Sequence, residues 1–174
     1  ICGQVDGSVI PGMVGLEAGQ SGFGDIYAWF KSVLAWPLEN ILKESALIDQ
    51  ETKQKLVDET LDKIIPTLSK EAEKIPVSES SLLAIDWMNG RRTPDANQMV
   101  KGTITGLNLA SSAPLIFKAL VEATAFGSKA IVDRFLENGI EINSVIGIGG
   151  ISLKSPLVMQ TLADVLAMPI KVAK

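Results

Sequence analysis

The stretch Val-Ile-Gly-Ile-Gly-Gly-Ile-Ser-Leu-Lys-Ser at residues 145–155 decides the fold expected for this chain. The apolar run over 144–148 predicts a buried strand, and a helix is expected over 155–166. Pro169 then opens a further strand. A strand that leads through paired glycines into a helix and a second strand is typical of an α/β domain.

The paired glycines, Gly149 and Gly150, suggest a ligand as well as a turn. Bare backbone and helix-terminal N–H groups at the end of a strand suit a nucleotide or another anion. The stretch lacks the Gly-Lys-Ser/Thr of a Walker loop, and Ser152 stands where a Rossmann fingerprint needs its last glycine. From the glycines alone, a tight strand-to-helix turn is the simpler interpretation.

The remaining elements are expected from apolar spacing and from glycine and proline. They are a hairpin turn at Asp6-Gly7, a helix over 25–34 stopped by Pro37, a charged helix over 49–74 kinked or divided by Pro66, a buried strand over 81–85, a strand over 101–107 and a helix over 114–137. The charged helix is expected to present a solvated face.

Composition narrows the functions to consider. The 174 residues suit one globular domain, and none is a histidine, which excludes Ser-His-Asp and Cys-His catalysis and most zinc sites. The net charge of −4 and the dispersed basic residues argue against a nucleic-acid partner. A lone Cys2 excludes a disulfide framework, and no apolar run suggests a membrane span or signal peptide, so we expect the cytoplasm.

Two further places could contact a ligand. Glu17 lies among glycines before a helix, where it could accept hydrogen bonds from a polyol, and a solvated loop explains it equally well. Asp25 is expected to cap that helix. The loop from Asp86 to Arg92 could form a binding edge, although internal salt bridges are the simpler interpretation of its charges.

Six segments of the sequence occur in an order that is characteristic of one family. They are residues 3–12 (GQVDGSVIPG), 15–21 (GLEAGQS), 25–30 (DIYAWF), 83–94 (LAIDWMNGRRTP), 122–127 (EATAFG), and Gly149-Gly150 with 163–166 (ADVL). This series resembles the carboxy-terminal domain of the FGGY carbohydrate kinases, and within that family the branch that phosphorylates L-ribulose. Leu115 and Leu120 depart from the family's second signature region, away from the expected chemistry.

The resemblance implies an actin-like, ribonuclease-H-like α/β domain with a mixed sheet flanked by helices. It implies transfer of the γ-phosphoryl of ATP, with Mg²⁺, to the 5-hydroxyl of L-ribulose. Carried over by position, Glu17 is a sugar contact and Gly24 meets the ATP phosphates. Gly149 and Gly150 lie against the nucleoside, and Lys154 lies near the base or ribose.

The family's catalytic aspartate and its first phosphate loops have no counterpart in these residues, so no catalytic residue is assigned within the chain. Residues 1–174 are therefore interpreted as a nucleotide-side domain cut at both ends, with a helical insertion at about 40–75 and an amino-terminal kinase domain as its partner. We expect it to fold without kinase turnover. Open alternatives are a non-catalytic actin-like sensor of sugar or nucleotide, and a kinase of xylulose or glycerol. A homodimer also stays open.

Overall fold

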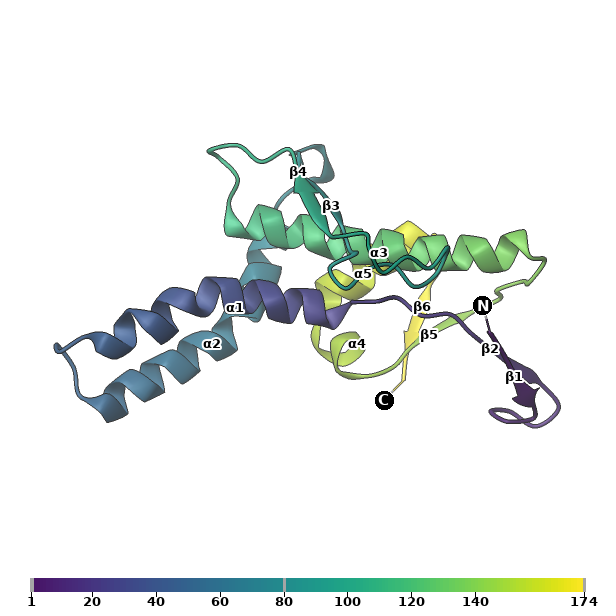
Figure 1. Cartoon of the computed structure of the whole chain (residues 1–174), viewed down its shortest axis with the longest axis horizontal. Coiled ribbons are helices and arrows are strands. Elements are labelled where there is room, and N and C mark those ends of the chain that lie inside the picture. The colour runs from purple at the N-terminus through teal and green to yellow at the C-terminus, as the bar shows by residue number, and fades with distance from the viewer. Residues whose placement is uncertain (1, 80, 174) are drawn as a thin grey trace.

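The structure is a computed structural model that describes residues 2–79 and 81–173 (Figure 1). Its strands are β1 (Cys2–Asp6), β2 (Val14–Glu17), β3 (Leu83–Ile85), β4 (Thr103–Thr105), β5 (Val145–Gly147) and β6 (Ile170–Val172). Its α-helices are α1 (Gly24–Asn40), α2 (Gln50–Glu73), α3 (Ala113–Glu137), α4 (Gly150–Lys154) and α5 (Pro156–Leu166), with short 3₁₀ turns at Leu42–Glu44 and Val77–Glu79.

Helix α3 forms the centre of the molecule. Its start is fixed by Ser112, whose Oγ accepts a hydrogen bond from the Leu115 N–H at 3.4 Å, and by Pro114 in the first turn. Its end is marked by Gly139, which has a φ of 74° just beyond the helix. The helix expected over 114–137 is thereby confirmed.

The hydrophobic core lies where α1, α2 and α5 pack against α3 (Figure 1). Apolar residues recur at helical spacing on each of these helices, so each presents one apolar face to the others. The buried cluster consists of Ile26, Tyr27, Phe30, Leu68, Ala72, Phe117, Leu120, Val121 and Val158. Because α2 contributes Leu68 and Ala72, the carboxy-terminal part of the charged helix belongs to the core.

The strands of the described chain form two-stranded ladders. β1–β2 and β3–β4 are antiparallel, and β5–β6 is parallel with α4 and α5 in the crossover. The α/β class is confirmed. The strands expected to be buried have one open face, since Leu83 is 68 % exposed and Ile146 is 61 % exposed. In β3 only Ala84 turns toward the core cluster, because α3 covers one face of that ladder.

The prediction that Pro37 stops its helix was wrong. Helix α1 continues through Pro37 to Asn40, and the Ile41 N–H still donates to the Pro37 carbonyl at 2.9 Å. A proline in the last turn removes one N–H, to which the packed helix adapts. Helix α2 is not divided at Pro66, and the alternative expectation of a kink there stays a prediction. The segment near 40–75 is helical as expected, and its status as an insertion stays a prediction.

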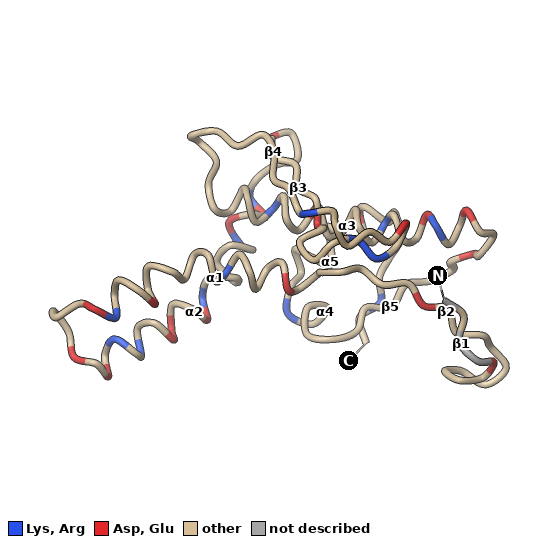
Figure 2. Tube along the Cα trace, in the orientation of Figure 1, with Lys and Arg blue, Asp and Glu red and all other residues tan. Residues whose placement is uncertain are grey.

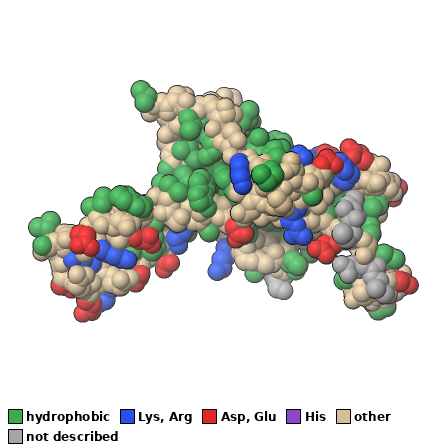
Figure 3. Space-filling view, viewed as in Figure 1, with side chains coloured by type: hydrophobic (Ala, Val, Ile, Leu, Met, Phe, Trp, Pro, Cys, Tyr) green, Lys and Arg blue, Asp and Glu red, His purple; other side chains and the backbone are tan. Residues whose placement is uncertain are grey.

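Helices α1 and α2 form a long hairpin that projects from the body, and the β1–β2 hairpin projects at the other end (Figure 1). Basic and acidic residues are both found along α2 (Figure 2), where Lys55 pairs with Glu51 at 2.6 Å and Lys63 pairs with Glu59. These exposed pairs confirm the solvated face. Apolar side chains gather over the centre of the molecule (Figure 3). Across the described ranges, no helix combines the length and apolarity that a membrane crossing requires.

Candidate functional site

A pocket of about 630 Å³ opens between α2 on one side and α4 with the start of α5 on the other. Tyr27 and Phe117 form its aromatic floor, with ring centroids 5.6 Å apart in an edge-to-face arrangement. Ile65, Pro66, Ser69, Lys70 and Glu73 line it from α2, and Gly150, Ile151, Lys154, Ser155 and Pro156 line it from the opposite side. This volume and mixed lining are typical of small-molecule sites.

The paired glycines form the tight turn expected between β5 and α4. Gly149 has a φ of 92°, a backbone conformation that favours glycine. A Cβ atom added at Gly149 or Gly150 would meet nothing within 4 Å, so open space lies over this backbone. Gly150 also lines the pocket, so this residue borders a cavity large enough for a ligand.

Gly24 lies at the start of α1 and against α4. A Cβ atom at Gly24 would lie 2.7 Å from Cδ1 of Ile151, a residue that lines the pocket. Phe23 is the N-cap and makes no side-chain cap bond, so the expected cap at Asp25 was wrong; Asp25 stands in the first turn. The N-terminus of this 17-residue helix, which no side chain caps, therefore lies beside Ile151 of α4.

Glu17 lies elsewhere. It ends β2, is exposed, and is opposite Cys2 in the ladder. The β1–β2 hairpin lies well apart from α4 (Figure 1), and Glu17 does not line the 630 Å³ pocket. The structure thus gathers Gly24, Gly149, Gly150 and Lys154 and leaves the predicted sugar contact outside the group.

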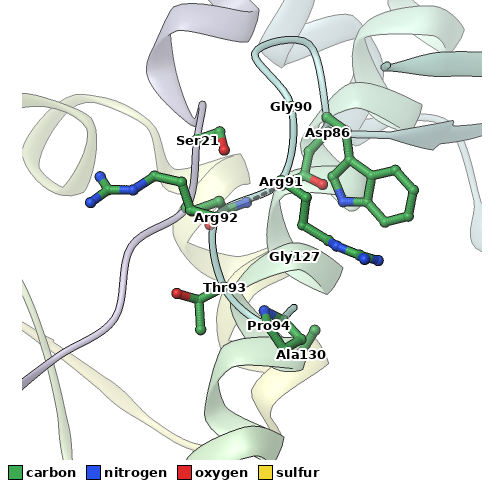
Figure 4. Close-up of a pocket in the computed structure, with 11 residues that line it drawn as sticks. Ser21, Asp86, Gly90, Arg91, Arg92, Thr93, Pro94, Gly127 and Ala130 are labelled. Carbon is green, nitrogen blue, oxygen red and sulfur yellow. Dashed lines mark hydrogen bonds between the residues drawn. The ribbon is translucent and has the colours of Figure 1, made fainter. Parts of the chain in front are cut away.

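A second, smaller pocket of about 160 Å³ lies beside the Asp86–Arg92 loop (Figure 4). The Gln20 Nε2 donates to Asp86 Oδ2 at 2.5 Å and to the Thr124 carbonyl at 2.9 Å, while the Ser128 hydroxyl donates to Gln20 Oε1 at 2.9 Å. Burial raises the pKa of the Asp86 carboxyl, and the Gln20 hydrogen bond opposes this. The amide of Gln20 therefore clamps the segment before α1 to α3 and to the loop.

The internal salt bridges expected in this loop are not formed by its two arginines within the described part of the chain. Arg91 donates from Nε to the Asp95 carbonyl at 2.8 Å and lies over the ring of Trp87, 4.8 Å from its centroid. Its side chain and that of Arg92 extend to opposite sides in Figure 4. The ion pair of this region joins Asp95 to Arg134 at 3.1 Å, outside the loop.

Comparison with known proteins identifies the family. The model of the "FGGY family of carbohydrate kinases, C-terminal domain" matches residues 1–174. The chain belongs to the FGGY family. A ribulokinase of Vibrio parahaemolyticus is 51 % identical over 177 aligned residues, which cover 100 % of this FGGY chain and 30 % of the relative. A ribulokinase of Bacillus licheniformis is 36 % identical over 99 % of the chain and 29 % of its own length.

Solved structures agree on the fold. A xylulose kinase from Rhodospirillum rubrum superposes with a TM-score of 0.71 at 21 % identity, covering 94 % of this chain and 28 % of that one. A glycerol kinase from Plasmodium falciparum, crystallised with ADP, gives a TM-score of 0.56 at 23 % identity, covering 83 % and 25 %. The FGGY chain thus has the actin-like ATPase fold of these sugar kinases, and it spans about 30 % of the length of the curated relatives it matches.

Proposed function

We propose that this chain is the nucleotide-binding domain of an ATP-dependent L-ribulose kinase. The observation that carries the proposal is the 630 Å³ pocket, which is lined by Gly150 and Lys154 and lies beside the start of α1, a segment more than 120 residues away in the sequence. The relatives named ribulokinase support L-ribulose as the sugar. We expect the protein to work in the cytoplasm.

The pocket suits the nucleoside of ATP. The apolar side chains of Ile65, Pro66 and Ile151 line the pocket and offer apolar surface to a purine, and the bare backbone of Gly149 and Gly150 permits close approach. Lys154 lines the same pocket, where its ammonium group can donate to the base or ribose. These residues bind and orient the nucleotide in the proposed complex.

The phosphates are proposed to extend toward Gly24 at the start of α1. Amides at a helix N-terminus favour negative charge, so this end of the helix suits the phosphate chain. The magnesium ion would arrive bound to the phosphate oxygens and balance their charge. In the proposed orientation the γ-phosphoryl would face a second domain, which would present the sugar.

The sugar side is proposed to include Glu17, which accepts hydrogen bonds from sugar hydroxyls. In the reaction, a base removes the proton from the 5-hydroxyl, the new P–O bond forms, and the bond from the γ-phosphorus to ADP breaks. We place that base in an amino-terminal kinase domain. Because positioning supplies most of the catalysis in phosphoryl transfer, this chain alone is expected to bind ATP without consuming it.

Two measurements test the proposal. Isothermal titration calorimetry of the chain with MgATP should show one binding site, and ADP release by the chain with L-ribulose should stay at the rate of the buffer. A longer kinase that contains this domain should release ADP with L-ribulose in preference to D-xylulose and glycerol. A folded chain that binds no ATP would refute the nucleotide assignment, and preference for another sugar would refute L-ribulose.

A further inference from the structure

Gln20 lies on the segment that joins the two residues proposed to meet the substrates. It comes three residues after Glu17, the proposed sugar contact, and four residues before Gly24, the proposed phosphate contact. Residues 18–23 form no helix or strand, yet none of them is exposed. Because this segment has no hydrogen-bonded ladder of its own, its path depends on contacts with the rest of the molecule.

The side chain of Gln20 supplies three of those contacts. Its Nε2 donates to Asp86 Oδ2 at 2.5 Å and to the Thr124 carbonyl at 2.9 Å, and its Oε1 accepts from the Ser128 hydroxyl at 2.9 Å. No other side chain of residues 18–23 forms a hydrogen bond with the described part of the chain. The position of the segment therefore depends on this one amide more than on any other side chain.

Thr124 of α3 anchors both the middle of this segment and the helix that follows it. Its carbonyl accepts from Gln20, and its hydroxyl lies 2.6 Å from the hydroxyl of Tyr27 in α1. The Thr124 hydroxyl itself donates to the Val121 carbonyl at 2.8 Å, so Tyr27 is the donor in that pair. Thr124 is fully buried, and a Cβ atom at Gly127 would lie 2.5 Å from Gln20 Nε2. Such close packing leaves the amide little freedom to move.

This attachment limits how far the two proposed contacts can shift. An extended chain spans at most about 3.6 Å per residue, so the path from Glu17 to Gly24 could stretch to about 25 Å if nothing held it. Gln20 holds the path after its third step, which keeps Glu17 within about 11 Å of a fixed point. Phosphoryl transfer needs the attacking hydroxyl aligned with the γ-phosphorus, and a displacement of about 1 Å can cost about 100-fold in rate.

We propose that Gln20 is a positioning residue for phosphoryl transfer: its amide fixes the segment from Glu17 to Gly24, so that the sugar hydroxyl and the phosphate end of ATP meet at a constant separation. The inference rests on the proposed function, because it takes Glu17 and Gly24 to contact the two substrates. Asp86 supports it. Burial raises the pKa of this carboxyl, so its ionised form costs folding free energy at neutral pH. Positions where a protein gives up stability are often functional.

Gln20→Met in the longer kinase tests the proposal, because methionine keeps the length of the side chain and removes its amide. Initial rates of ADP release, measured well below the Tm of each variant, should give a kcat with L-ribulose that is about 10- to 100-fold lower. The KM values for ATP and L-ribulose should change less than about threefold, because both contacts remain present. Asp86→Asn keeps an acceptor for the Gln20 amide, so its kcat should stay within about twofold of the wild type.

Lys118→Met is the matched control for loss of stability. The Lys118 Nζ donates to the Ile75 carbonyl and ties α3 to the residues after α2, so it does not hold residues 18–23. This variant should lower the Tm as Gln20→Met does and leave kcat at the wild-type value. Should Gln20→Met fail to fold, the double variant with Asp86→Asn avoids an unpaired buried carboxylate and should show the same fall in kcat.

The outcomes separate this inference from the proposed function. If the wild-type kinase phosphorylates L-ribulose and Gln20→Met keeps its kcat within about twofold, the positioning role is overturned and the proposed function stands. An equal fall in kcat in Lys118→Met would show that turnover follows stability, and it would overturn the positioning role as well. A wild-type kinase without turnover of L-ribulose overturns the proposed function together with the inference that rests on it.

Discussion

The substitution Gly150→Val tests the nucleotide pocket most directly. A Cβ atom at Gly150 meets nothing within 4 Å, and Gly150 is absent from the positive-φ glycines, so the folded chain should accept the side chain without strain. The same side chain enters the space where the nucleoside is proposed to lie. Crowding of a fitted site by extra methyl groups costs about 1–3 kcal/mol, which corresponds to a Kd raised about 5- to 150-fold.

Titration calorimetry with MgATP measures this loss, and thermal unfolding without ligand checks the fold. Gly3→Val is the matched control, because Gly3 also has room for a Cβ, with Leu16 Cδ2 as its nearest neighbour at 4.0 Å, and it lies in the β1–β2 hairpin. The control should bind ATP like the wild type. An unchanged Kd in a folded Gly150→Val chain would remove the glycine turn from the nucleotide site.

Further expectations concern the sugar contact and the clamp. In the longer kinase, Glu17→Ala should raise the KM for L-ribulose more than that for ATP; equal KM values for L-ribulose in variant and wild type would exclude a sugar contact. Gly127→Ala should lower the Tm in calorimetry by several degrees, because a Cβ there would lie 2.5 Å from Gln20 Nε2, and overpacking costs about 1–3 kcal/mol; an unchanged Tm would contradict it. Burial raises the pKa of Asp86, so stability falls as the pH rises through that pKa. Asp86→Asn should therefore raise the Tm at neutral pH, with the advantage lost below about pH 4, where both states are protonated in the wild type. Asp95→Asn should lower the Tm at neutral pH, because Arg134 lowers the pKa of Asp95 and so the ionised carboxylate stabilises the folded state. For either variant, a Tm that changes with pH in parallel with that of the wild type would refute the expectation.

Local sequence patterns predicted correctly those elements whose formation depends on neighbouring residues. Helix α3 follows from its apolar spacing and from the residues that begin and end it. Strand β5, the glycine turn and strand β6 follow from short apolar runs that are bounded by glycine and proline. The end of α1 could not be found in this way. Whether a helix continues past Pro37 depends on how strongly tertiary packing stabilises its last turn, and a local sequence pattern does not reveal tertiary packing.

Long-range contacts were the other missing information. Gln20 bonds to Asp86 across 66 residues and to Ser128 across 108, and nothing near Gln20 marks it as the centre of a clamp. Gly127, which leaves no room for a side chain beneath the Gln20–Asp86 pair, is itself distant from Gln20 in the sequence. The exposed face of β3 was missed for a related reason, because a short apolar run looks the same whether one or both faces are covered.

The strongest functional argument is that the residues predicted to bind the nucleotide lie together, while the predicted sugar contact lies elsewhere. Gly24 and Ile151 are distant in the sequence, yet the contact between them leaves no room for a Cβ at Gly24, so the start of α1 is held beside the glycine turn. The residues assigned to ATP by resemblance are thus held in one region by packing that does not depend on the resemblance. Glu17 does not line the pocket. The chain spans about 30 % of the length of its ribulokinase relatives. Its proposed nucleotide residues lie together and its proposed sugar contact lies on a separate hairpin, which fits the proposal that one domain holds the phosphoryl donor while another domain completes the sugar site.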